Sequence, residues 1–297
     1  MIQNIVSVSG GKDSTALLLL AIRRNTENLR AIFADTGNEH EMTYEYVQYL
    51  NDNVFPIEIV KADFTQQLAN KAKFVATKWR EHGVPESRVL TAIEMLKPTG
   101  NPFLDLCLWK GRFPSTKTRF CSEELKRNPM IEQVILPALE NGQVNSWQGV
   151  RRDESPSRAK LEELEEVGGG LWNYRPILDW TAEDCFEMHQ QCGVKWNPLY
   201  ELGMGRVGCM PCIHCRKDEL LEISKRFPEE LQRIAEWEKL VSDTAKQGHA
   251  TFFYDPTGTG TVWDKVEWSK TKWGGKEIDP DRIVEPTMCS SIYGLCE

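Results

Sequence analysis

Short apolar, β-branched runs alternate with segments of helical character in the first part of the chain. Strands are expected at residues 2–8, 29–34 and 54–60, and helices at residues 15–24 and 42–51. Such alternation is typical of parallel strands joined by right-handed helical crossovers. The pattern predicts an α/β fold with a doubly wound, mostly parallel sheet.

The middle of the chain is less regular. Helix is expected over residues 63–96, with a break at 83–85, and again over 125–139 despite two prolines. The segment from 98 to 119 is rich in Pro, Gly and Lys and is expected to be irregular. Further strands are predicted at 144–150 and 174–178, and Thr181 offers the N-cap of a helix that reaches about Cys192.

The pattern changes near residue 200. Residues 218–246 are mostly helical in character, and the chain from Gly248 is rich in glycine and aromatic residues. We therefore predict a nucleotide-binding α/β domain over residues 1–200. Residues 201–297 are predicted to form a metal-binding loop, helices and a cysteine-containing tail packed on that domain.

Composition excludes several classes of protein. The 297 residues are 40% hydrophobic and 27% charged, which is ordinary for a soluble globular chain. The apolar run at residues 16–22 is far shorter than the ~20 residues that span a bilayer. The first residues also lack the positive segment of a signal peptide. A cytoplasmic protein without a membrane partner is the expectation.

The net charge of −8 argues against a protein that coats nucleic acid without regard to sequence. The charge is not uniform, because six basic and two acidic residues lie between Lys110 and Arg127. This stretch is either a solvated loop or an anion-binding surface. Nucleic acid on this stretch is therefore a candidate partner.

A glycine-containing loop joins the first strand to the first helix. Backbone N–H groups and the helix dipole can hold a phosphate at such a junction. The loop is not a Walker A motif, because Val6 stands where that motif needs glycine. Lys12 supplies a point charge, and Lys12 and Asp13 are also candidate catalytic residues. The predicted nucleotide-binding residues here are Ser7, Ser9, Gly10, Gly11, Lys12, Asp13 and Ser14.

The second strand is followed by Asp35, Thr36 and Gly37, at the carboxyl edge of the predicted sheet. Open α/β sheets bind ligands at this edge. Asp35 can accept a hydrogen bond from a ribose, an adenine or a metal-bound water. These three residues are added to the predicted nucleotide site.

Five segments in order resemble known proteins over about residues 4–215. Ser-Gly-Gly-Lys-Asp-Ser resembles the signature of the PP-loop superfamily of adenine nucleotide alpha hydrolase-like proteins. The other four resemble phosphoadenosine phosphosulfate (PAPS) reductases, and they read FADTGNEHEMTYEYV, GVRRDESPSRA, RPILDWTAEDCFEMHQQCGVKWNPL and GCMPC. The second of these looks like the arginine-rich substrate loop of the reductases. Arg151, Arg152 and Arg158 carry guanidinium forks suited to sulfate or phosphate, although ion pairs with Asp153 and Glu154 are the alternative.

The chain has nine cysteines, and Cys209, Cys212 and Cys215 stand at three-residue intervals. In a reducing compartment such thiols favour metal binding or catalysis over disulfides. The resemblance aligns Cys121 with the first cluster-cysteine segment of the iron–sulfur reductases, which implies a [4Fe–4S] cluster on these four thiolates. Zinc fits the same ligands, His214 can replace one sulfur, and metal-free cysteines are the third interpretation.

The resemblance implies a reductase that binds PAPS or adenosine phosphosulfate (APS). A tail thiol, for which we select Cys296 over Cys289, attacks the sulfur, and thioredoxin-type thiols release sulfite. Two departures favour an alternative: the phosphate loop is intact, and the tail lacks the reductases' Glu-Cys-Gly-x-His motif. That alternative is an ATP- and Mg²⁺-dependent sulfur transferase that adenylates and thiolates a nucleic acid with a sulfur donor. The sequence does not determine the oligomeric state, and a homodimer is one candidate.

Overall fold

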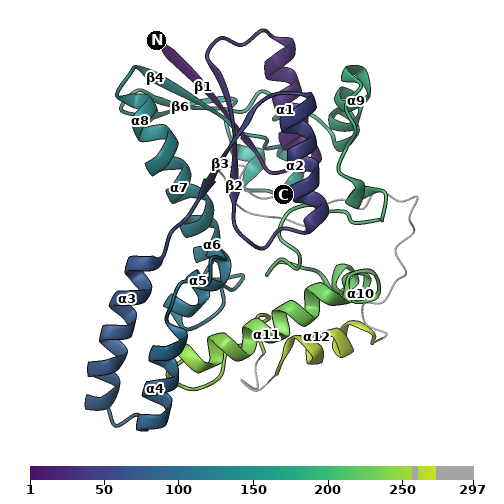
Figure 1. Ribbon diagram of the computed structural model, residues 1–297. Coiled ribbons are helices and arrows are strands. Elements are labelled where there is room, and N and C mark those ends of the chain that lie inside the picture. Colours follow the sequence, from purple (N-terminus) through teal and green to yellow (C-terminus); the bar gives the residue numbers. More distant parts are fainter. Residues whose placement is uncertain (256–259, 272–297) are drawn as a thin grey trace.

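A computed structural model of the chain describes residues 1–255 and 260–271. Six strands of this part form one sheet in the order β3-β2-β1-β4-β6-β5 (Figure 1). Neighbouring strands are parallel except β5 and β6, which are antiparallel. The strands are β1 (Ile2–Val8), β2 (Leu29–Asp35), β3 (Ile57–Lys61), β4 (Gln143–Trp147), β5 (Leu164–Gly168) and β6 (Leu171–Tyr174). The predicted α/β fold with a mostly parallel sheet is confirmed.

Both faces of the sheet are covered because its central strands are apolar on both sides. On one face, Val6 and Val8 belong to a buried cluster shared with α1 (Lys12–Arg23), α2 (Glu41–Asn53) and α9 (Ala182–Cys192). On the other face, Ile5 packs with residues of the helical stretch that ends at Leu139. The sheet is therefore doubly wound, as predicted.

One continuous helical stretch runs from Phe120 to Leu139 along that second face. It contains α6 (Phe120–Ser122), a π-helical turn (Glu123–Arg127), α7 (Asn128–Met130), a second π-helical turn (Ile131–Ile135) and α8 (Leu136–Leu139). The helix predicted at residues 125–139 is confirmed and begins earlier, at Phe120. Each π turn directly precedes a short segment that carries a proline, which has no N–H to donate within the helical stretch.

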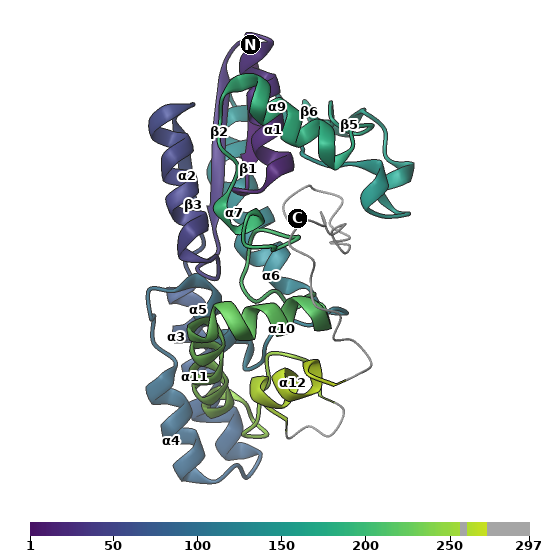
Figure 2. The ribbon, with the colours of Figure 1, turned by 90° about the vertical axis from the view of Figure 1, so that its right-hand side faces the viewer.

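A helical lobe lies beyond the carboxyl edge of the sheet (Figures 1 and 2). Its buried core draws on segments before and after residue 200, and Phe103 stacks on Trp237 with ring centroids 5.6 Å apart. The domain boundary near residue 200 stays a prediction. The helices of the lobe are α3 (Thr65–Phe74), α4 (Glu86–Met95), α5 (Pro102–Lys110), α10 (Lys217–Arg226), α11 (Pro228–Thr244) and α12 (Val262–Ser269).

The expectation of an irregular segment at 98–119 is wrong for α5. The Asn101 side chain caps this helix by accepting a hydrogen bond from the Leu104 N–H at 3.0 Å, and Pro102 occupies the first turn. Gly111 then ends the helix in the left-handed conformation, with φ +64°. These start and stop signals were present in the sequence, but the neighbouring prolines and glycines outweighed them.

The strand expected at 174–178 is also misplaced, because β6 ends at Tyr174. Its antiparallel partner β5 was not predicted, since every residue of β5 is exposed and its polarity does not alternate. The helix expected from Thr15 begins at Lys12. The helix capped by Thr181 is confirmed, with the Thr181 hydroxyl accepting from the Asp184 N–H at 3.2 Å.

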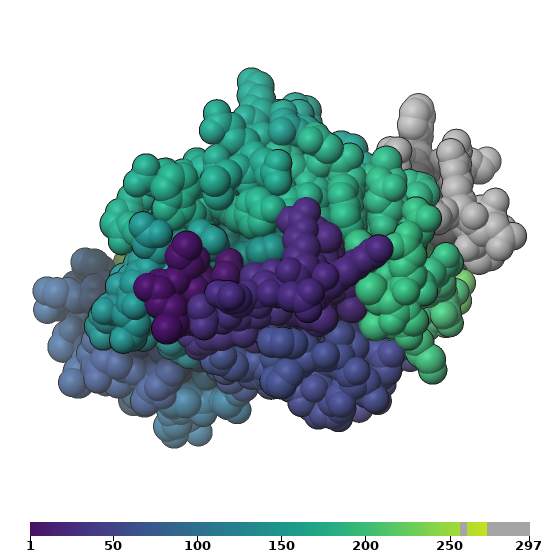
Figure 3. All heavy atoms as spheres, turned by 90° about the horizontal axis from the view of Figure 1, so that it is seen from above, coloured from purple at the N-terminus to yellow at the C-terminus, as the bar shows by residue number. Residues whose placement is uncertain are grey.

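The amino ends of the strands face away from the helical lobe. Figure 3 shows this end of the molecule, where the N-terminal residues lie at the surface beside segments of the middle of the chain. No helix in the described ranges has the length and apolar character needed to cross a bilayer. The carboxyl edge of the sheet, by contrast, meets the lobe, and the predicted site residues gather there.

Candidate functional site

Hydrogen bonds of its own side chains fix the conformation of the loop between β1 and α1. The Ser14 hydroxyl accepts from the Ser9 backbone N–H at 3.1 Å and lies 3.1 Å from the Gly11 carbonyl, to which it donates. Gly10 has φ +82°, and a Cβ there would lie 2.9 Å from Cγ2 of Thr43. Glycine is needed for both reasons. The loop and the start of α1 lie at the carboxyl end of β1, and phosphate binding there stays a prediction.

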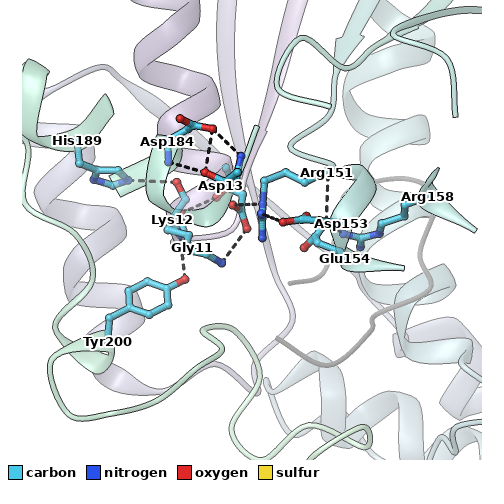
Figure 4. A network of polar contacts seen from close by, with 12 residues as sticks. Gly11, Lys12, Asp13, Arg151, Asp153, Glu154, Arg158, Asp184, His189 and Tyr200 are labelled. Carbon is cyan, nitrogen blue, oxygen red and sulfur yellow. Dashed lines mark hydrogen bonds and ion pairs between the residues drawn. The ribbon is translucent and has the colours of Figure 1, made fainter. Parts of the chain in front are cut away.

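A later segment of the chain supports this loop from outside. The Asn197 amide donates to the Gly10 carbonyl at 3.2 Å, and the Lys12 N–H donates to the Tyr200 hydroxyl at 2.9 Å (Figure 4). The His189 Nε2 lies 3.1 Å from the Lys12 carbonyl. Sequence reasoning gave these three supporting residues no role. All three lie in or directly after the segment RPILDW…NPL. That segment supported the family resemblance, but it was not connected with the loop between β1 and α1.

Asp13 is the centre of a buried charge network. Its carboxylate lies 3.0 Å from the Lys12 ammonium and 2.8 Å from Nε of Arg151, and Asp13 and Arg151 are 0% and 1% exposed (Figure 4). Burial opposes ionisation of Asp13, but the charges of Lys12 and Arg151 outweigh it and lower its pKa. Burial, followed by the Asp13 charge, raises the pKa of the adjacent Cys185 thiol. The network fixes the arginine loop against the phosphate loop.

The three arginines of the predicted sulfate site do not converge on one point. Arg151 pairs with Asp13 and Asp153, Arg152 pairs with Asp179 at 2.6 Å, and Arg158 pairs with Glu154. These are the kind of ion pairs that the sequence analysis kept as an alternative. A sulfate-binding role for these arginines stays a prediction.

The last residue of β2 and the residues after it form a second polar corner. Asp35 accepts hydrogen bonds from the Gly37 N–H at 2.9 Å and the Tyr44 hydroxyl at 2.8 Å. The Thr36 hydroxyl donates to the carboxylate of Glu39, with its two oxygens at 2.7 and 2.8 Å. This corner lies beside the phosphate loop because β1 and β2 are adjacent and parallel.

A cavity lies between the carboxyl edge of the sheet and the cysteine-containing loop, and we call it the inner cavity. From the sheet it is lined by polar residues that include Ser7, Ser9, Thr36 and Glu39. From the opposite side it is lined by three cysteines and three basic residues. These are Cys121, Lys126, Arg206, Cys209, Cys212 and His214. Three of the predicted nucleotide-binding residues (Ser7, Ser9 and Thr36) and three of the predicted metal ligands therefore line one cavity.

Two thiols of the inner cavity have a raised pKa. Burial and, to a smaller degree, Cys212 raise the pKa of Cys121 to about 11. Burial and the charge of Glu39 raise the pKa of Cys209 to about 12. In residues 1–255 and 260–271, no three His, Cys, Asp or Glu side chains are arranged to hold a metal ion. The predicted metal centre on Cys121, Cys209, Cys212 and Cys215 stays a prediction, and we derive no chemical step through a metal.

The basic stretch between Lys110 and Arg127 is partly neutralised within itself. Lys110 lies 2.9 Å from Glu124, and Arg127 pairs with Glu123. Lys126 is buried, and it lines the inner cavity. The tail cysteines Cys289 and Cys296 lie outside the described residues.

The described residues form an α/β protein in which the loop between β1 and α1 and three cysteines line one cavity. The model of the phosphoadenosine phosphosulfate reductase domain matches residues 3–215. The chain therefore belongs to the phosphoadenosine phosphosulfate reductase domain family. The predicted resemblance is confirmed.

Individual relatives show how far the similarity extends. An uncharacterized 37.8 kDa protein of Escherichia phage 186 is 48% identical, over 99% of this chain and 96% of that protein. A phosphoadenosine 5'-phosphosulfate reductase of Erwinia tasmaniensis is 42% identical over 29% of this chain and 36% of its own length. The match to a solved PAPS reductase from Candida auris covers 71% of this chain and 82% of that protein. The two sequences are 17% identical, and the TM-score is 0.43.

Proposed function

We propose that this protein is a sulfur-metabolism enzyme that binds an adenylylated sulfate and reduces it to sulfite with thiols. The observation that carries the proposal is the inner cavity, which is lined by phosphate-loop serines at one wall and by three cysteines at the other. A nucleotide on the loop places its terminal group toward the thiols. A cytoplasmic location fits such thiol chemistry.

The phosphate loop supplies binding and orientation. The N-terminus of α1 offers N–H groups and a positive dipole to the nucleotide phosphate. Lys12 supplies a mobile positive charge once its ammonium leaves Asp13 for the phosphate. Asn197 and Tyr200 keep the loop in shape, so that little ordering is needed when the nucleotide binds.

The proposed reaction has two balanced steps. A cysteine thiolate, for which Cys296 is our choice, attacks the sulfur of the sulfate, the S–O bond to the phosphate breaks, and AMP or its 3′-phosphate leaves. A second thiolate, from a thioredoxin-type reductant, then attacks the cysteine sulfur of the S-sulfonate. Sulfite leaves with the electron pair, and the two thiols are oxidised to a disulfide.

A specific observation supports a second candidate, ATP-dependent sulfur transfer. The loop Ser9–Gly10–Gly11–Lys12 is intact and stands at the start of a helix, which suits cleavage of a pyrophosphate linkage. In this reaction Lys12 stabilises charge on the leaving pyrophosphate while an acceptor oxygen is adenylated. Bound Mg²⁺ would supply further charge neutralisation. A nucleic acid acceptor and a sulfur donor remain proposals.

Product analysis distinguishes the two candidates. We expect wild-type protein with PAPS or APS and reduced thioredoxin to release equal amounts of sulfite and adenosine phosphate. With ATP, Mg²⁺ and a sulfur donor, we expect no pyrophosphate above a control without protein. Pyrophosphate release from ATP together with inert PAPS and APS would replace the first proposal with the second.

The predicted [4Fe–4S] cluster is a separate proposal. Cys209, Cys212 and Cys215 lie on one loop, and Cys121 lines the inner cavity together with Cys209 and Cys212. We expect anaerobically purified protein to be brown and to hold about four irons per chain. Cys212→Ser should lower the iron content and the stability together, because cluster binding is coupled to folding. Colourless wild-type protein with one zinc would contradict the cluster and retain the four-cysteine site.

A further inference from the structure

Two segments that are far apart in the sequence form a direct backbone junction. One is the polar corner after β2, and the other is the cysteine loop, which we define as residues 208–215. The Met210 N–H donates to the Asn38 carbonyl at 2.8 Å, and the Asn38 side-chain amide donates to a further carbonyl of the loop at 3.1 Å. Glu39 and Cys209 add an antiparallel bridge. The predicted nucleotide corner is therefore linked to the cysteine loop by main-chain contacts.

Arg233 of α11 binds to both segments at this junction. Its Nη2 donates to the Met210 carbonyl at 2.8 Å, and its Nη1 donates to the Gly37 carbonyl at 3.4 Å. The planar guanidinium carries its N–H groups in a fixed fork, so that one side chain holds two carbonyls at a set separation. The Gly37 carbonyl also accepts from the Asn101 amide at 2.7 Å. The carbonyl of the polar corner is thus held from two helices of the lobe.

The helical lobe fixes the Arg233 side chain. Arg233 forms an ion pair with Glu230, which lies one turn earlier on α11. Its guanidinium carbon lies 4.6 Å from the centroid of the Trp237 ring, within the range of a cation–π contact. Trp237 in turn stacks on Phe103 in the buried core of the lobe. Arg233 therefore ties the polar corner and the cysteine loop to one rigid support.

We infer that Arg233 is a positioning residue that couples the polar corner to the cysteine loop, so that a nucleotide held at the corner also orders the loop. Gly37 belongs to the predicted nucleotide site, and Met210 lies between two of the predicted metal ligands. A ligand that orders one segment lowers the cost of ordering a second segment that shares its contacts. The role of the nucleotide rests on the proposed function. The connection between the two segments does not, because it follows from the contacts of Arg233.

Hydrogen exchange followed by mass spectrometry tests this inference, with AMP as the probe. We expect AMP to slow exchange of wild-type protein in residues 35–40 and, by about fivefold or more, in the cysteine loop. In Arg233→Gln, AMP should still protect residues 35–40 but change exchange of the cysteine loop by less than about twofold. Arg226→Gln is the matched control, because Arg226 pairs with Glu222 on α10 and is 41% exposed. The control should behave as wild type.

Two results would overturn the inference. The first is equal protection of the cysteine loop by AMP in wild type and in Arg233→Gln, since direct contact of AMP with the loop gives that pattern. The second is protection of the polar corner alone in wild type. If Arg233→Gln does not fold, Arg233→Lys should fold because it keeps a charge beside Glu230. It should still lose the transmitted protection, because lysine lacks the fork.

A second measurement needs no nucleotide. Asn101→Ala removes the other side-chain donor to the Gly37 carbonyl, and we expect it to speed exchange of the cysteine loop. In the Arg233→Gln background the same change should have little effect on the loop, because the connection is already broken. Equal effects in both backgrounds would overturn the inference. If AMP, APS and ATP all leave the polar corner unprotected, the proposed function fails, and this comparison still decides the role of Arg233.

Discussion

Cys296→Ser is expected to abolish sulfite release while nucleotide affinity stays at the wild-type value. The thiolate is the attacking species, and serine at neutral pH supplies almost none of the corresponding anion. Wild-type protein incubated with PAPS or APS without reductant should accumulate a sulfonate adduct on Cys296. Mass spectrometry of a proteolytic digest detects the adduct, and an assay of sulfite detects the lost turnover.

Cys192 provides the matched control for this substitution. It is an exposed, free cysteine at the end of α9, so Cys192→Ser removes a reactive thiol from a different place. We expect Cys192→Ser to keep wild-type turnover and the adduct on Cys296. A Cys296→Ser variant with full sulfite release would assign the attack to another thiol. Full pyrophosphate release from ATP by the same variant would favour the transferase.

The sheet was predictable because its signal is local. The apolar run of β1, the glycine loop and the helix after it stand within about 25 consecutive residues, so propensity and order determine their structure. A local pattern predicts a buried strand such as β1, but it does not predict an exposed strand such as β5. β5 is a strand through its pairing with β6, and its glutamates carry no alternating pattern that reveals this pairing.

The sequence predicted which residues belong to the candidate site. It did not predict which of them form ion pairs or hydrogen bonds with one another. Ser9, Gly10 and Cys209 were selected by residue type and spacing, and the structure places their segments around one cavity. The partner of Arg151 is Asp13, 138 positions earlier in the chain. Sequence spacing favoured the nearby Asp153 and Glu154, because only the folded sheet brings Asp13 to the arginine loop.

Asp13→Asn is expected to destabilise the protein by about 3–5 kcal/mol, because it leaves the buried charges of Arg151 and Lys12 without their shared partner. Urea unfolding at pH 7 measures this change. Asp179→Asn is the matched control, since Asp179 also binds an arginine but is 81% exposed. We expect the control to change the free energy of unfolding by less than about 1 kcal/mol. The double variant Asp13→Asn/Arg151→Met should recover part of the lost unfolding free energy, because it removes one of the two cations that had paired with Asp13.

The pH dependence of the same variant tests the electrostatic cause. The folded protein holds the pKa of Asp13 below its ordinary value, through Lys12 and Arg151 and against the effect of burial. The contribution of Asp13 is therefore complete above about pH 4, the ordinary pKa of aspartate, and is lost as the pH falls through the lower pKa of the folded state. The difference in unfolding free energy between wild type and Asp13→Asn should be constant from pH 7 to about pH 5 and shrink below pH 4. A difference that stays constant down to pH 3 would show that Asp13 contributes by packing and not by its charge.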